Sequence, residues 1–138
     1  RDRPDLTIIV NGGIRTLDEC RAHLLAVDGV MLGREAYYNP WLMAGVDEAL
    51  YGDPAPVESR ADAVRQFMPY VAAEVAAGTP LTAMTRHMLA LMLGLPGARA
   101  WRRTLSEDAR TPGAGVDLLE SALVRLEEAC AAIVPRAA

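Results

Sequence analysis

Two short apolar runs on either side of a helical pattern constrain the fold of this chain more than any other feature. The runs cover residues 6–10 and 29–32, and each is too short for a helix and is followed within two residues by glycine. Between them, residues 16–26 carry apolar side chains at helical spacing. Strand, loop, helix and strand in this order indicate a parallel β/α fold.

The loops after the two predicted strands have the residue types of a phosphate site. Asn11-Gly12-Gly13 can turn tightly and bring bare backbone close to a ligand, because glycine has no Cβ. Gly33-Arg34 adds a second small residue and a cation. In (β/α)8 barrels, the loops after the last two strands frequently bind phosphate. Glycine pairs are also ordinary turn residues, but two successive loops of this kind predict that all five residues grip one phosphate.

The length of the chain limits how much of a barrel it can contain. With 138 residues, it suits one domain, or a small domain with an appendage, whereas a (β/α)8 barrel needs roughly 250 residues. The predicted strands would therefore belong to the C-terminal part of a barrel. Glycine and proline are concentrated in residues 51–57, which predicts a linker. We place the domain boundary there, with residues 1–52 as the barrel portion and residues 53–138 as a helical domain.

Capping signals and periodicity predict where the helices begin and end. Thr16 followed by Glu19 forms a capping box for the first helix, and Asn39-Pro40 predicts the start of a helix that ends near residue 50. Beyond the boundary we expect only helices, over residues 59–77, 81–93, 98–105 and 117–134. Asp117 followed by Glu120 repeats the capping-box spacing at the start of the last one. Pro69 should kink or divide the first of these four.

The charge pattern separates one segment from the rest of the chain. The net charge of -4 argues mildly against indiscriminate nucleic-acid binding. Residues 84–110, however, carry five arginines against two acidic residues. Arg99, Arg102 and Arg103 lie at i, i+3 and i+4, so a helix places them on one face. This face is suited to a phosphate backbone; the alternative is a solvated surface with Arg103 paired to Glu107.

The remaining reactive residues favour structural roles. Cys20 and Cys130 lie in amphipathic helix patterns, which indicates small core residues rather than a disulfide, a metal site or a nucleophile. This favours a reducing, cytoplasmic setting. His87 has no partner at metal-ligand spacing, so we expect a structural histidine beside Arg86 and no metal. No apolar run approaches the about 20 residues of a membrane span, and nothing resembles a signal peptide.

Four motifs, taken together and in order, resemble those of a known family. They are NGGI at residues 11–14, VMLGREAYYNP at 30–40, TRHML at 85–89 and GLPGARAWRR at 94–103. Their order and spacing resemble the tRNA-dihydrouridine synthases, in particular the subfamily that modifies uridines 20 and 20a of the tRNA D-loop. The resemblance extends from Ile8 to about Leu126.

The resemblance implies an α/β plus all-α fold: the last two βα units of a (β/α)8 TIM barrel that binds FMN, followed by a C-terminal helical bundle domain that binds tRNA. It implies reduction of the 5,6 double bond of uridine, with NADPH re-reducing the flavin, in a cytoplasmic enzyme that is monomeric when full length. The family's FMN-phosphate motifs fall on Asn11, Gly12, Gly13, Gly33 and Arg34. Its tRNA-contacting arginines fall on Arg99 and Arg102.

One departure from the family limits the expected activity. The family's general-acid cysteine, and its lysine and histidine beside the flavin ring, belong to earlier barrel strands that have no counterpart here. We therefore assign no catalytic residue and expect the chain alone to be inactive. Two alternatives remain. The first is another FMN or sugar-phosphate-binding TIM-barrel enzyme, which would not need a helical domain with a row of arginines. The second is a standalone helical RNA-binding module, which would bind tRNA without flavin.

Overall fold

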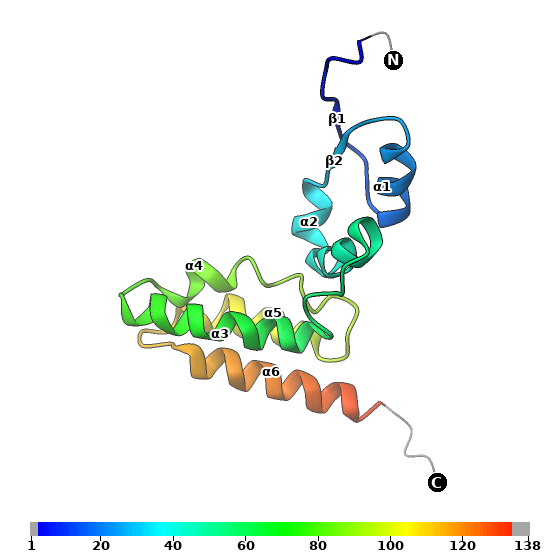
Figure 1. Cartoon of the computed structure of the whole chain (residues 1–138). Helices are drawn as coiled ribbons and strands as arrows, with labels where there is room; N and C mark the ends of the chain where they lie inside the picture. Colours follow the sequence, from blue (N-terminus) through cyan, green and yellow to red (C-terminus); the bar gives the residue numbers. More distant parts are fainter. Residues whose placement is uncertain (1–2, 134–138) are drawn as a thin grey trace. The chain divides into compact units, whose positions relative to one another are not determined.

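The structure is a computed structural model that describes residues 3–133 (Figure 1). It is mainly helical, with one small parallel sheet. The chain divides into two compact units between Pro56 and Val57, and each unit is described by itself. The assignment of residues 1–52 to a barrel and of residues 53–138 to a tRNA-binding domain stays a prediction.

The first unit contains the predicted strand, helix and strand. Strand β1 (Ile9–Asn11) pairs in parallel with β2 (Gly29–Met31), and helix α1 (Leu17–Leu24) connects them. Ile9 pairs with Gly29 and Asn11 with Met31, so both strands end at the same edge of the sheet. The strands are shorter than the apolar runs. Just before β1, the amide of Ile8 donates to the carboxylate of Asp28 at 2.9 Å.

The segment after β2 differs from the sequence prediction. The structure has helix α2 (Arg34–Tyr38), then a 3-10 turn η1 (Pro40–Gly45) and a π turn η2 (Asp47–Tyr51). The predicted helix start at Pro40, with Asn39 in the N-cap position, is confirmed. The segment is not one α-helix, because it forms a 3-10 turn and a π turn, and the Asn39 side chain makes no cap hydrogen bond. The amide of Asn39 donates to the carbonyl of Glu35 at 2.8 Å and so closes α2. Pro40 has no amide with which to continue α2.

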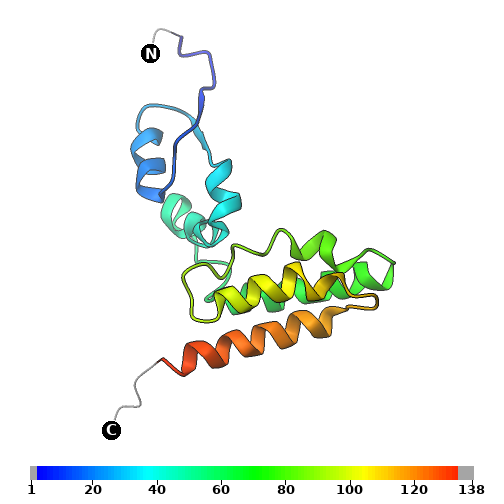
Figure 2. The same ribbon diagram turned by 180° about the vertical axis from the view of Figure 1, so that it is seen from behind.

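The second unit contains four α-helices among the described residues. They are α3 (Arg60–Ala76), α4 (Leu81–Thr85), α5 (Ala98–Ser106) and α6 (Val116–Ala131), with a 3-10 turn η3 (Asp108–Arg110) after α5. Ser59 caps α3 by accepting from the amide of Asp62. Pro69 lies inside α3, which continues through it undivided. Helix α6 packs against both α3 and α5 (Figure 2).

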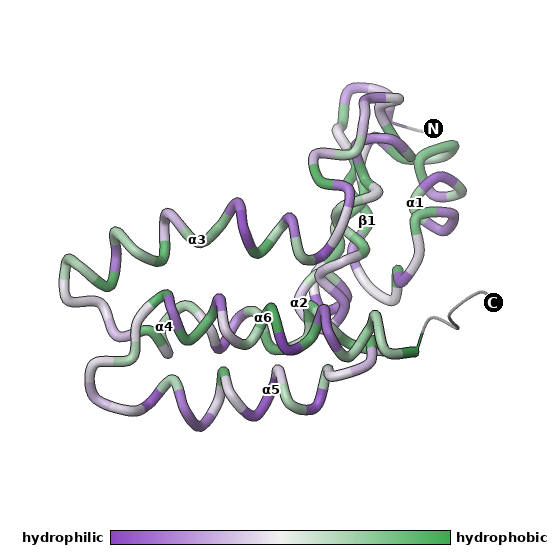
Figure 3. Tube along the Cα trace, turned by 90° about the horizontal axis from the view of Figure 1, so that it is seen from below, coloured by the Kyte–Doolittle hydropathy of each residue, from purple (hydrophilic) through white to green (hydrophobic). Residues whose placement is uncertain are grey.

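Apolar residues from all four helices form one core in this unit. Hydrophobic and hydrophilic residues alternate along each helix (Figure 3), as amphipathic helices require. The largest fully buried side chain is Trp101, which is 1% exposed. The core also includes Val64, Val71, Leu81, Met84, Met88, Met92, Leu105, Leu119, Ala122, Leu123 and Leu126. Trp101 and Leu105 anchor α5 in this core.

The predicted helix over residues 81–93 is shorter in the structure. Helix α4 ends at Thr85, and residues 86–97 form turns that include amide-to-carbonyl bonds three residues apart. Two buried hydrogen bonds attach this segment to α5. The Thr85 hydroxyl donates to the carbonyl of Leu105, and the indole N–H of Trp101 donates to the carbonyl of Met88, each at 3.1 Å. The Met88 carbonyl therefore accepts both from the indole of Trp101 and from the amide of Leu91 three residues further on.

The last helix also begins differently. Gly115 is its N-cap, and no side chain caps it, so Asp117 lies within the first turn and the predicted capping box with Glu120 is wrong. The predicted end at Val134 lies outside the described residues. Within residues 3–133, no helix has the length and apolarity needed to cross a membrane.

We expect Trp101→Phe to destabilise the second unit. The change removes the indole donor from the Met88 carbonyl, which keeps its hydrogen bond from the amide of Leu91. Loss of one hydrogen bond costs about 0.5–1.5 kcal/mol, and the change also removes buried volume. The urea midpoint of the far-ultraviolet circular dichroism signal should fall accordingly. Val124→Ala, at an exposed position of α6, should change stability by less than about 0.5 kcal/mol. Equal midpoints for the two variants would contradict the role given to the indole.

Candidate functional site

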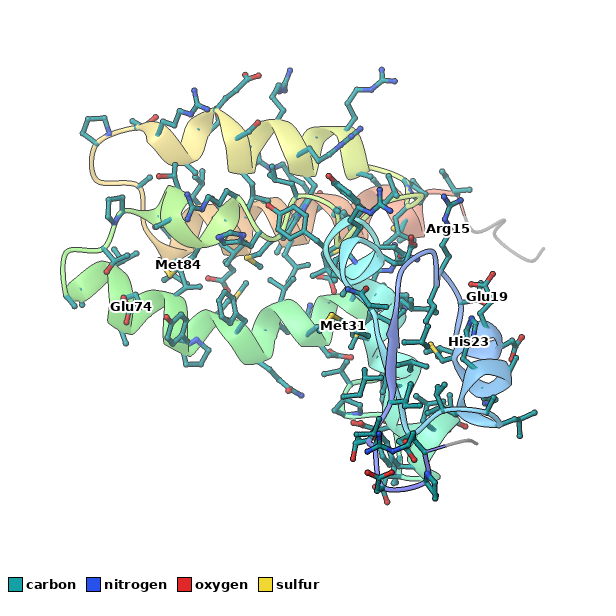
Figure 4. The ribbon with its side chains drawn as sticks, turned by 90° about the horizontal axis from the view of Figure 1, so that it is seen from above. Arg15, Glu19, His23, Met31, Glu74 and Met84 are labelled. Carbon is teal, nitrogen blue, oxygen red and sulfur yellow. The ribbon has the colours of Figure 1, made fainter. Side chains whose placement is uncertain are left out.

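One pocket joins the ends of both strands of the first unit. Its volume is about 680 Å³, and it is lined by the loop after β1, by the end of β2 and by the start of α2. In Figure 4, Arg15 lies on the loop before α1 and Met31 on β2. All five predicted phosphate-binding residues line this pocket, together with Ile14, Arg15, Met31, Glu35 and Tyr38. The structure therefore brings the five residues together, while their binding of FMN phosphate stays a prediction.

The glycines supply backbone donors to this pocket. Gly12 and Gly13 have φ of +116° and +74°, which side chains with a Cβ rarely adopt. A Cβ added at Gly12, Gly13 or Gly33 would meet no atom within 4 Å, so the space beside these backbones is open. In the described part of the chain, nothing accepts a hydrogen bond from these three amides. They are thus available to an anion, and this donor set fits a phosphate group.

The charged side chains of the pocket favour an anion as well. Arg34 and Arg15 both line it, and neither forms an ion pair within residues 3–133. Glu35 is the acidic residue of the lining, so the cations outnumber the carboxylates. Because guanidinium groups present several N–H donors in a planar fork, they match the geometry of phosphate oxygens.

The loop between the glycines and α1 is fixed by the predicted capping box, which the structure confirms. The Glu19 carboxylate accepts from the amides of Arg15 at 2.7 Å and Thr16 at 3.1 Å, and the Thr16 hydroxyl accepts from the amide of Glu19 at 3.1 Å. The hydrogen bonds from Arg15 and then Thr16 lower the pKa of Glu19. Ile14, the residue before Arg15, is buried. The buried Ile14 side chain and the capping box together hold this part of the loop in place.

Five lining residues were not among the five predicted for the site: Ile14, Arg15, Met31, Glu35 and Tyr38. Two of them belong to α2, which was not predicted because Asn39-Pro40 suggested a helix start further along. A helix beginning directly after Gly33 would have placed Arg34, Glu35 and Tyr38 within one turn of each other. Tyr38 is exposed, and its ring makes an edge-on contact with that of Tyr37.

The second predicted site is an exposed face of α5. Arg99, Arg102 and Arg103 are exposed there, while Trp101, Thr104 and Leu105 point into the core. Among the described residues, none of the three arginines forms an ion pair, and the alternative pairing of Arg103 with Glu107 is not made. The structure therefore has an uncompensated cationic face, and contact with RNA stays a prediction.

The cysteines lie in separate places. Cys20 is fully buried on α1, and burial is the main cause that raises the pKa of its thiol, with the charge of Glu19 adding to it. Cys130 is half-buried on α6, and both thiols are free. Within residues 3–133, no three histidine, cysteine or acidic side chains are grouped as a metal ion would need.

Comparison with known proteins identifies a family. The sequence pattern of the family described as "Dihydrouridine synthase (Dus)" matches residues 1–127. Three similar proteins are each named tRNA-dihydrouridine(20/20a) synthase. They come from Vibrio cholerae, 51% identical over 91% of this chain, Pseudomonas putida, 49% identical over 92%, and Escherichia coli K12, 50% identical over 89%. The chain spans 36–38% of the length of these relatives.

The capping box should make the first unit sensitive to acid. Because the folded pKa of Glu19 lies below its ordinary value, its stabilisation is complete above the unfolded pKa and disappears as the pH falls through the folded pKa. Carboxyl carbon shifts in an NMR titration should place the Glu19 midpoint below that of an ordinary glutamate. Thr16→Ala removes one bond of the box and should move the midpoint upward. An ordinary midpoint in the unaltered chain would contradict this arrangement.

Proposed function

Because this chain belongs to the dihydrouridine synthase family, we propose that it is the C-terminal portion of an FMN-dependent tRNA-dihydrouridine(20/20a) synthase. In this proposal, the first unit is the last two βα units of a (β/α)8 barrel. The second unit is a helical domain that binds tRNA. The complete enzyme is cytoplasmic and monomeric.

The pocket at the ends of β1 and β2 is the observation that carries this proposal. Three glycine amides without an acceptor in the described chain and two arginines line one cavity. A phosphate group requires several donors converging from different segments, and the two loops provide them from neighbouring parallel strands. Asn11, Gly12, Gly13, Gly33 and Arg34 would hold the FMN phosphate.

Bound FMN, re-reduced by NADPH, supplies the hydride that reduces the 5,6 double bond of uridine. The residues of this chain act by binding and orientation. The first loop and Arg34 fix the phosphate end of the cofactor, and the capping box of Thr16 and Glu19 keeps that loop in place. Neither Cys20, which is buried on α1, nor Cys130 on α6 lines the pocket. Without a general acid, the chain alone would not complete the reaction.

The α5 arginines would position the RNA. Phosphate contacts fix the register and orientation of a nucleic acid without reading its sequence. Arg99, Arg102 and Arg103 are exposed on a helix whose other face is held by Trp101 and Leu105. A rigid cationic face of this kind would present the target uridine by orienting the whole tRNA.

Replacing Arg34 tests the phosphate assignment. Hydrogen bonds to charged groups contribute about 1.5–3 kcal/mol, so Arg34→Ala should weaken FMN binding by about tenfold or more. Riboflavin, which lacks the phosphate, should bind both forms equally. Flavin fluorescence quenching measures both affinities, and Arg125→Ala on α6 is the control for loss of one exposed arginine. Equal losses for FMN and riboflavin would overturn the assignment.

Replacing Arg99 and Arg102 together tests the RNA face. Each phosphate contact contributes about 0.7–0.9 to the slope of log affinity against log salt, so the double alanine variant should flatten this slope by about 1.5. Fluorescence anisotropy with labelled, unmodified tRNA at several salt concentrations measures it. Arg34→Ala should leave the slope unchanged. An unchanged slope in the double variant would remove these arginines from the interface.

A further inference from the structure

Arg86 and His87 form an exposed pair that neither the core nor the proposed α5 face includes. They follow directly after α4, and both side chains are exposed. The Nε of Arg86 donates a hydrogen bond to Nε2 of His87 at 2.9 Å. Their neighbours in sequence, Thr85 and Met88, are buried. The pair is therefore carried on a short segment whose two ends are fixed in the core.

The attachment of this segment places the pair beside α5. Thr85 bonds to the carbonyl of Leu105, and the carbonyl of Met88 accepts from Trp101. Residues 85–88 therefore run antiparallel to residues 101–105. The two residues between the attachment points lie opposite the middle of this stretch. Arg102 lies in that stretch and is exposed.

The charges around Arg86 are not balanced by acids. Glu107 and Asp108 are the acidic residues at the end of α5 and the start of η3, and neither forms an ion pair with Arg86 among residues 3–133. The bond to His87 uses the Nε of the guanidinium and leaves its two terminal Nη groups for other acceptors. An oriented guanidinium fork is suited to phosphate oxygens.

We propose that Arg86, oriented by His87, is a further phosphate-backbone contact, which extends the RNA-binding face from α5 onto the segment that follows α4. This inference rests on the proposed binding of tRNA. The proposed contact is with the phosphate of the RNA, whose oxygens match the paired Nη donors of the guanidinium. His87 acts as a positioning residue through Arg86.

Salt titrations of tRNA binding by the full 138-residue chain test this contact. Arg86→Ala should lower the slope of log affinity against log salt by about 0.7–0.9 and weaken binding several-fold. Arg86→Lys keeps the charge and should retain most of the slope. Arg125→Ala, which removes an exposed arginine from α6, should change neither quantity. An Arg86→Ala slope equal to that of Arg125→Ala would overturn the proposal.

The single variant Arg102→Ala separates the two levels of inference. If Arg102→Ala flattens the slope and Arg86→Ala does not, the RNA face on α5 stands and its extension is wrong. If neither variant differs from the unaltered chain, the proposed tRNA face itself is wrong. Circular dichroism of each variant should match that of the unaltered chain, because the two arginines are exposed.

Variants of His87 test its positioning role. His87→Gln keeps a hydrogen-bond acceptor and should bind tRNA like the unaltered chain, whereas His87→Phe keeps a ring without an acceptor and should weaken binding. In the Arg86→Ala background, His87→Phe should have no additional effect, because there is no guanidinium left to orient. Equal losses with and without Arg86 would show that His87 acts independently and would overturn its positioning role.

Discussion

The indole N–H of Trp101 determines how the middle of the second unit is built. It donates to the carbonyl of Met88, which also accepts from the amide of Leu91 three residues further on, whereas an uninterrupted α-helix would use the amide four residues further on. Together with the bond from Thr85 to Leu105, it holds residues 85–88 along α5. A buried polar group is costly without a partner, so the core requires this arrangement. As a result, Arg86 and His87, which lie between these two hydrogen bonds, are held next to α5.

The parts of the fold that depend on neighbouring residues could be predicted from the sequence. The capping box of Thr16 and Glu19, the Ser59 start of α3 and the extent of α5 all follow from local propensity and periodicity. The parts that depend on distant partners could not. The helix expected over residues 81–93 is shortened by contacts with α5, and the capping-box spacing at Asp117 is not used because the chain already enters α6 at Gly115.

The candidate site divides in the same way. Glycine loops after two predicted strands were sufficient to identify five of the residues that line the pocket, because parallel pairing brings strand ends together. Glu35 and Tyr38 depend on α2, a helix of five residues whose limits are set by hydrogen bonds at Asn39 rather than by periodicity. The hydrogen bond between Arg86 and His87 depends on side-chain orientation, which helical spacing does not describe.

The donors of the glycine loops belong to the main chain, and this has a consequence for how such a site changes over evolutionary time. Amide groups are encoded by every residue except proline, so no exchange of a neighbouring side chain can delete them. Mutations can, however, alter the path of the backbone. Gly12 and Gly13 have left-handed conformations, so substitutions at these two positions would disturb that path most. The surrounding side chains can change without removing these main-chain donors.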